Sequence, residues 1–243
     1  MFLIDKNKLF LGAAENFQDI CFIYPLKIKE IFGLGEGVFE KYLGLLTLNA
    51  REVEKKLQEA GIEQQFSAFE FLLISASLND NFLLDLQKAF STFIKEEVHI
   101  SIDTKEIFVG DISRNRVLNE ENFEDFQMVV RVQNCLSVPE PIPKNENPMQ
   151  RKFRLRREQV AEAKRKNAQN GEGLPLDEIL TKLICFNVGI TFDNVGNLTY
   201  YQFRKLFTCA QAKYKYDLDL SMIAAGADPK KIKPKSWLEK LDI

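Results

Sequence analysis

The stretch Leu198-Thr-Tyr-Tyr-Gln-Phe-Arg-Lys-Leu-Phe207, which continues to Met222-Ile-Ala-Ala-Gly-Ala-Asp-Pro229, decides the fold of this sequence. Thr199 and Gln202 have the spacing of a capping box, in which each side chain accepts a hydrogen bond from the other residue's backbone. The spacing predicts that a helix rich in aromatic residues begins at this point. A helix of this kind is more typical of a protein that binds other proteins than of an enzyme.

A second, shorter helix is expected to follow the aromatic helix. Asp217 or Asp219 would cap it, because a short carboxylate accepts hydrogen bonds from the first free N–H groups of a helix. Gly226 would end it, because glycine adopts the left-handed conformation that often follows a helix.

The aromatic segment contains residues suited to a core and residues suited to a surface. Phe203, Leu206 and Phe207 favour a core position. A ring with a polar tip suits a binding surface. We therefore assign partner binding to the tyrosines and the arginine of the segment: Tyr200, Arg204, Tyr214 and Tyr216.

Upstream, hydrophobic spacing of three and four residues indicates a series of helices. Asn49 with Glu52 and Ser67 with Glu70 have capping-box spacing, and Asn79 and Asn119 each precede an apolar helical pattern. The pattern changes in two places. Apolar residues flank a polar turn within residues 2–11, and an alternating run with a polar turn covers residues 98–110. Each of these predicts a small β-hairpin.

Four prolines within residues 137–150 interrupt the chain, and at that density they fit neither a helix nor a central strand. We therefore predict a mainly α protein in four parts: residues 1–136 as a helical N-terminal domain with two β-hairpins, 137–150 as a Pro-rich linker, 151–173 as a basic helix or arm, and 174–243 as a small C-terminal helical domain.

The basic arm is the strongest charge feature of a chain whose formal net charge is only -2. A solvated helix or a partly disordered linker is the first interpretation, an acidic protein partner the second, and nucleic acid the third. Acidic residues between the basic ones weaken the local field. The arm contains Arg151, Lys152, Arg154, Arg156, Arg157, Lys164, Arg165 and Lys166.

The sequence offers little on which to build an active site or a metal site. The single histidine, His99, falls on the polar side of a predicted strand and has no evident catalytic partner. The glycines from Gly33 to Gly37 lack the Gly-Lys-Ser/Thr ending of a phosphate-binding loop. The four cysteines are far apart, which favours buried, reduced thiols. We expect no catalytic residue, no metal and no cofactor.

No secretory signal and no apolar run long enough to cross a membrane are evident in the sequence. The sequence therefore predicts a soluble protein of the cytoplasm with no membrane partner.

Three blocks of the sequence resemble tail assembly chaperone-type proteins of long-tailed phages and prophages of Gram-positive bacteria. The first is Tyr24-Pro-Leu-Lys-Ile-Lys-Glu-Ile31. The second extends from Ser67 to Asn134, and the third joins Leu198-Thr-Tyr-Tyr-Gln-Phe203 to Ala224-Ala-Gly-Ala-Asp228. The resemblance covers most of the chain and consists of packing and capping patterns.

The resemblance implies a largely helical, non-enzymatic protein that acts in the host cytoplasm during virion assembly. Its implied partners are the tape-measure protein, whose long helices it keeps soluble, and the tail-tube protein; self-association is a further option. It implies no catalytic residues. Two alternatives stay open: a structural component of the virion, such as a connector or baseplate-associated protein, and, less favoured, a nucleic-acid-binding module that uses the basic arm.

Overall fold

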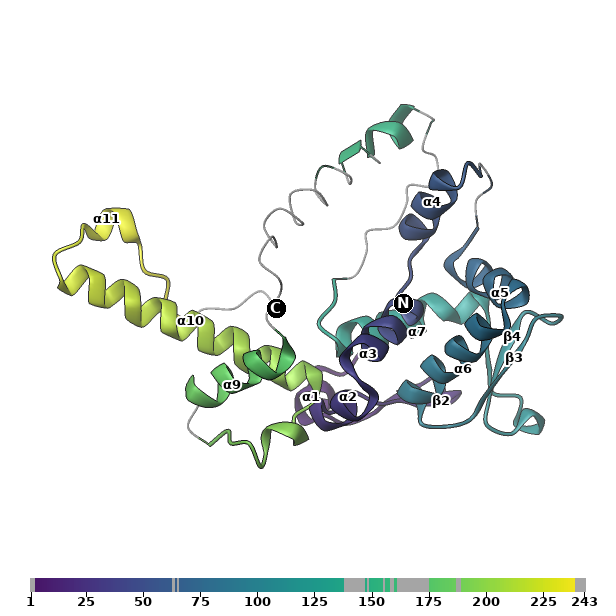
Figure 1. Ribbon diagram of the computed structural model, residues 1–243, viewed down its shortest axis with the longest axis horizontal. Coiled ribbons are helices and arrows are strands. Elements are labelled where there is room, and N and C mark those ends of the chain that lie inside the picture. Colours follow the sequence, from purple (N-terminus) through teal and green to yellow (C-terminus); the bar gives the residue numbers. More distant parts are fainter. Residues whose placement is uncertain are drawn as a thin grey trace.

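The computed structural model describes residues 3–62, 64, 66–137, 147, 149–154, 156–157, 160, 175–186 and 189–238. It is mainly α-helical with two small antiparallel sheets, which confirms the predicted fold class (Figure 1). The helices are α1 (Lys6–Leu11), α2 (Ile28–Leu34), α3 (Glu36–Leu46), α4 (Ala50–Glu59), α5 (Ala68–Leu78), α6 (Asp80–Ile94), α7 (Glu120–Gln133), α9 (Leu176–Phe186), α10 (Tyr200–Ala224) and α11 (Pro229–Ile232).

The strands form one hairpin and one three-stranded sheet. β1 (Glu15–Phe17) pairs with β2 (Cys21–Ile23). β3 (Val98–Ser101) pairs with β4 (Glu106–Val109), which pairs in turn with β5 (Val117–Leu118). The predicted hairpin over residues 98–110 is therefore confirmed, and β5 is a third strand that the sequence pattern did not indicate.

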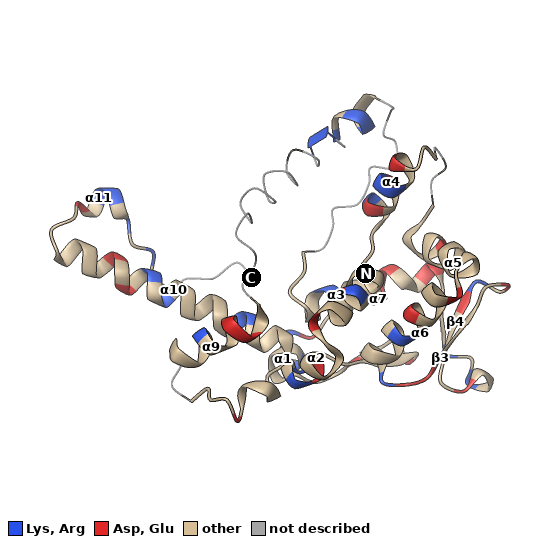
Figure 2. Cartoon of the chain, in the orientation of Figure 1, with Lys and Arg blue, Asp and Glu red and all other residues tan. Residues whose placement is uncertain are grey.

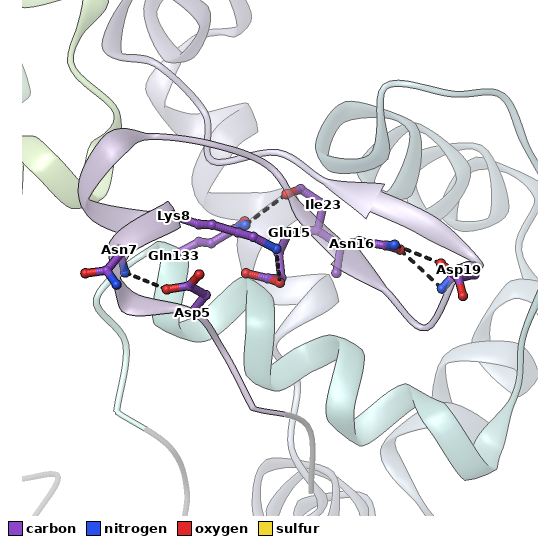
Figure 3. A network of polar contacts seen from close by, with 8 residues as sticks. All are labelled: Asp5, Asn7, Lys8, Glu15, Asn16, Asp19, Ile23 and Gln133. Atoms are coloured by element: carbon purple, nitrogen blue, oxygen red, sulfur yellow. Dashed lines mark hydrogen bonds and ion pairs between the residues drawn. The ribbon is translucent and has the colours of Figure 1, made fainter.

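The hairpin predicted within residues 2–11 is wrong, because residues 6–11 form α1. The Asp5 side chain accepts a hydrogen bond from the Asn7 backbone N–H at 2.8 Å and so caps this helix (Figure 3). The first hairpin lies later, in β1 and β2. Asn16 and Asp19 hydrogen-bond to each other across its turn, where Gln18 and Asp19 have positive φ. The helix cap that Asp5 provides therefore determines the structure of this segment, and the apolar residues on both sides of the polar turn do not pair as strands.

The predicted helix starts at Asn49, Ser67, Asn79 and Thr199 are confirmed. Asn49, Ser67 and Thr199 form reciprocal capping boxes, and the Asn79 side chain accepts from the backbone N–H of Phe82 at 3.1 Å. Capping depends on residues three positions apart in the chain, so the sequence alone is sufficient to place these boundaries.

The expectation of two helices after Thr199 is wrong, because α10 is one continuous helix from Tyr200 to Ala224. Asp217 and Asp219 lie inside it rather than at a cap. No glycine or proline interrupts the sequence before Gly226, and an aspartate inside a helix costs less than about 0.7 kcal/mol relative to alanine. Continuing the helix therefore costs less than breaking it and capping a new one.

A cluster of phenylalanine rings fills the centre of the core. Phe126 of α7 contacts Phe17 of β1 at 5.8 Å between ring centroids and Phe90 of α6 at 5.4 Å. Phe123, one turn earlier on α7, contacts Phe69 of α5 at 5.1 Å. Since all five rings are at least 97% buried, they join the hairpin, α5, α6 and α7 into one packed unit.

Residues from both sides of the proline-rich segment contribute to this core. Leu180 and Leu183 of α9 and Phe203 of α10 are buried in the same cluster as the phenylalanines. The Ile28 backbone N–H donates to the Leu198 carbonyl at 2.9 Å, and the Tyr200 N–H donates to the Leu26 carbonyl at 2.9 Å. The start of α10 is thus fixed to the segment before α2. The predicted division into domains stays a prediction.

Candidate partner-binding surfaces

A groove of about 500 Å³ lies where α3, α4, α5 and α6 meet. Its floor and walls are largely aliphatic and aromatic side chains. Leu48 and Leu72 are buried, whereas the other three apolar residues are partly accessible. The apolar residues that line it are Leu45, Leu48, Phe71, Leu72 and Phe82.

Charged side chains of both signs surround this groove. Lys41 of α3 forms an ion pair with Asp85 of α6 at 2.5 Å, and the Lys56 ammonium of α4 lies 5.9 Å from the Phe71 ring centroid. Glu52 accepts a hydrogen bond from the Asn49 backbone N–H at 3.0 Å. Helix α4 supplies most of the charged rim, with Glu52, Lys55, Lys56 and Glu59. An apolar floor with a charged rim fits an amphipathic helix, whose apolar stripe enters the groove.

Gly44 of α3 also lines the groove and leaves space within it. A Cβ atom built at this position meets no heavy atom within 4 Å. The backbone of α3 is therefore open toward the groove there, and a larger side chain at residue 44 would occupy the space in which a ligand side chain would lie.

The four predicted partner-binding residues lie along α10 and do not form one patch. Tyr200 is half-buried, with its ring 5.6 Å from Phe39 and 5.9 Å from Phe203, and burial raises the pKa of its hydroxyl. Arg204 is half-buried as well. These two residues lie where α10 joins the core, and the Tyr200 ring is already in contact within the chain.

Tyr214 and Tyr216 lie in the outer half of α10, beyond the residues that pack on the core. Tyr214 is 55% exposed, and its ring centroid lies 5.4 Å from that of Phe186, the last residue of α9. Tyr216 is half-buried. Figure 1 shows this half of α10 extending away from α1, α2 and α9. Partner binding by these tyrosines stays a prediction.

Part of the predicted basic arm forms ion pairs within the chain. Arg151 and Arg154 both bind Glu54 of α4, and the Arg154 Nη2 to Glu54 Oε2 distance is 2.8 Å. Lys152, Arg156 and Arg157 are exposed. The remaining three predicted residues, Lys164, Arg165 and Lys166, lie outside the described residues. Two of the arginines are thus engaged with a carboxylate that is 8% exposed, which lowers the positive field available to a nucleic acid.

The residues considered for chemistry do not come together. His99 is exposed on β3, 4.0 Å from Glu97. Cys21 is buried, whereas Cys185 is exposed, so burial of all four thiols was a wrong expectation. In the described ranges, no three His, Cys, Asp or Glu side chains are arranged to hold a metal ion. None of the described helices combines the length and apolarity that crossing a bilayer requires.

Sequence reasoning missed the groove because four separate helices build it. The capping boxes at Asn49 and Ser67 predicted α4 and α5, but no local pattern indicates that these helices leave a gap beside α3. The signal in the sequence was Gly44, because a glycine inside a helix costs about 1 kcal/mol relative to alanine and leaves that position without a side chain.

The comparisons with known proteins connect the C-terminal part of the chain with phages. Residues 164–242 match a family model described as the YomV second domain, which is a family of Bacillus prophage origin. A search of curated proteins and a search of solved structures each gave no match. The matched segment includes α9, α10 and α11 and covers about a third of the chain.

Proposed function

We propose that this chain is a non-enzymatic phage protein that binds a helical partner in the groove between α3, α4, α5 and α6 during tail assembly. In this proposal it acts as a tail assembly chaperone in the host cytoplasm, with the tape-measure protein as its main client and the tail-tube protein as a second partner. The groove is the observation that carries the proposal.

The groove supports binding of a helix because of its shape and composition. A long amphipathic helix exposes an apolar stripe that aggregates in water when it has no partner. Leu45, Phe71 and Phe82 offer this stripe an apolar surface that is still partly accessible. The lysines and glutamates of α4 stand where the polar flanks of such a helix would lie. Exposed charge pairs add little affinity, and they favour release of the client at a later step.

The phage context rests on the family match and on the resemblance described above. The match to a prophage-derived domain over residues 164–242 supports a phage protein, and the resemblance supports tail assembly as the step. The client's identity follows from the resemblance alone and is part of the proposal.

The test is co-expression with the tape-measure protein encoded in the same phage or prophage genome. The amount of tape-measure protein that stays soluble and co-purifies with the chain is measured. Gly44→Trp is the test variant, because it places a large side chain in the groove without a clash at Cβ. Gly37→Trp is the matched control: it lies on the same helix, its Cβ also meets nothing within 4 Å, and it does not line the groove.

We expect the wild-type chain and Gly37→Trp to retain the tape-measure protein, and Gly44→Trp to retain about tenfold less, which corresponds to about 1.4 kcal/mol of binding free energy. Equal retention by both variants would exclude the groove as the binding site. Mass spectrometry of purified virions distinguishes a chaperone from the main alternative, a structural component of the virion. A chaperone is absent from the particle, whereas a connector or baseplate-associated protein is present at a fixed copy number.

A further inference from the structure

The start of the basic arm, residues 149–154, is a short helical segment that lies against α4. A reciprocal cap fixes its beginning: the Asn147 backbone N–H donates to the Gln150 side chain at 3.0 Å, and the Gln150 N–H donates to the Asn147 side chain at 2.8 Å. Arg151 and Arg154 are three residues apart, so they lie on the same side of the segment. Figure 2 shows the basic residues of this segment next to the charged residues of α4.

The two arginines bind a carboxylate of α4 that solvent barely reaches. Glu54 accepts from Arg151 through Oε1 and from Arg154 through Oε2, so each carboxylate oxygen has its own guanidinium. The exposed fraction is 8% for the Glu54 side chain and 12% for that of Arg154. Salt screens a pair this buried much less than a surface pair. Loss of the arginines would leave a buried charge without compensation, which is strongly unfavourable.

The groove and the arm lie on nearly opposite sides of α4. Because an α-helix has 3.6 residues per turn, the residues of α4 that line the groove share one face of the helix: Glu52, Lys55, Lys56 and Glu59. Glu54 falls nearly opposite this face. Val53 and Leu57, which are buried in the core, lie on the side between the two. The segment of residues 149–154 therefore stands behind the wall that α4 gives to the groove.

The start of α4 is attached to α7 by two hydrogen bonds from buried side chains. The Gln127 amide donates to the Leu48 carbonyl at 2.6 Å, and the Arg131 guanidinium donates to the Thr47 carbonyl. A helix that is fixed at its start moves most at its far end. Because the arm lies behind the wall, a movement of α4 that widens the groove is directed toward residues 149–154. The two ion pairs with the arm therefore oppose this movement.

We propose that the start of the basic arm positions α4 as a wall of the groove, so that the ion pairs of Arg151 and Arg154 with Glu54 set how firmly the groove holds an amphipathic client helix. This inference rests on the proposed function, because it concerns the same groove, and it assigns control of that groove to residues 97 and 100 positions later in the chain. By linkage, detachment of the arm weakens client binding, and a bound client strengthens the attachment of the arm.

The experiment measures hydrogen exchange of the full chain by mass spectrometry of peptides from α4 and α6, together with retention of the tape-measure protein in the co-expression assay. The test variant R151E/R154E places two carboxylates beside Glu54. The matched control is K152E/R156E, which changes the net charge by the same amount on the same part of the chain, at two exposed positions. The triple variant E54K/R151E/R154E exchanges the signs of all three charges and restores their attraction.

We expect R151E/R154E to raise the exchange rate of the α4 amides at least about tenfold, since three carboxylates then meet at a buried position. The control and the triple variant should stay within about threefold of the wild-type rate. The α6 amides should exchange at the wild-type rate in every variant, which shows that the core is intact. R151E/R154E should retain about tenfold less tape-measure protein than the wild-type chain, and the triple variant should regain it.

Two results would overturn the proposal. The first is equal α4 exchange in R151E/R154E and K152E/R156E, which would show that the arm does not hold the helix. The second is faster α4 exchange with wild-type retention of the tape-measure protein, where Gly44→Trp lowers that retention; the groove would then not depend on the arm. If Gly44→Trp leaves retention unchanged, the proposed function fails and the coupling to a client fails with it, while the exchange rates still decide whether the arm positions α4.

Discussion

Replacing Gly12 by alanine tests how the N-terminal helix is joined to α10. Gly12 ends α1 with φ +71°, in the left-handed region, and a Cβ there would lie 2.9 Å from the Thr199 Cγ2 atom. Thr199 is 1% exposed and caps α10, and the Gln202 side chain donates to the Phe10 carbonyl at 2.8 Å. These neighbours are held by their own hydrogen bonds, so they have little freedom to move aside.

Two costs therefore add at this position. The left-handed conformation costs about 1–2 kcal/mol for alanine relative to glycine. The close contact costs about a further 1–3 kcal/mol, as overpacking of a filled site does. Gly61→Ala is the matched control, because Gly61 has φ +73° but its Cβ would meet nothing within 4 Å. Gly61→Ala therefore has the cost of the left-handed conformation without the cost of the close contact.

The free energy of unfolding is measured by urea titration of the wild-type chain and both variants. We expect Gly12→Ala to lose about 2–4 kcal/mol and Gly61→Ala about 1 kcal/mol, after the gain that alanine brings by restricting the unfolded chain. A loss for Gly12→Ala within about 0.5 kcal/mol of that for Gly61→Ala would refute the close packing of α1 on the start of α10.

Three further predictions concern stability and reactivity. Gly44→Ala should raise the free energy of unfolding by about 0.5–1 kcal/mol in the same titration, because Gly44 is helical and its Cβ meets no neighbour; a loss would contradict the open groove. The Arg116 guanidinium donates to the Glu96 carboxylate and holds the pKa of that carboxyl below its usual range. The pair therefore stabilises the fold above the unfolded-state pKa of about 4.3, and this stability is lost as the pH falls below it, so Arg116→Met should flatten the acid limb of a stability-against-pH curve. Burial, with a smaller contribution from the nearby Glu96 charge, raises the pKa of the Cys21 thiol to about 12, whereas Cys185 is exposed; iodoacetamide at pH 8 should label Cys185 in the native chain and Cys21 only after unfolding, as peptide mass spectrometry would reveal.

The sequence predicts those parts of the fold that depend on near neighbours. The starts of α4, α5, α6 and α10 follow from capping residues that lie within three positions of the helix they begin. The hairpin of β3 and β4 follows from alternation over a few residues. These features need no knowledge of distant contacts.

Other parts depend on contacts between distant segments, and there the sequence is insufficient. The bridge between Lys27 and Thr199 joins residues on opposite sides of the proline-rich segment. The groove needs α3, α4, α5 and α6 in their final positions. The prediction of a break near Asp217 was wrong because a capping residue permits a helix start but does not require one. The tyrosines of α10 share one helix, but whether each is covered depends on where the core ends.

The position of Phe203 in the core has a consequence for how the protein is made. A ribosome that has synthesised the chain as far as residue 136 has produced Leu26, Ile28 and Phe39, but not the Tyr200 and Phe203 rings and the Leu198 carbonyl that contact this region. At bacterial elongation rates the missing segment arrives on the order of seconds later. During that interval the nascent N-terminal segment exposes apolar surface. A product that terminated at residue 136 would keep this surface exposed. For this chain, a segment translated well after residue 136 completes the interior.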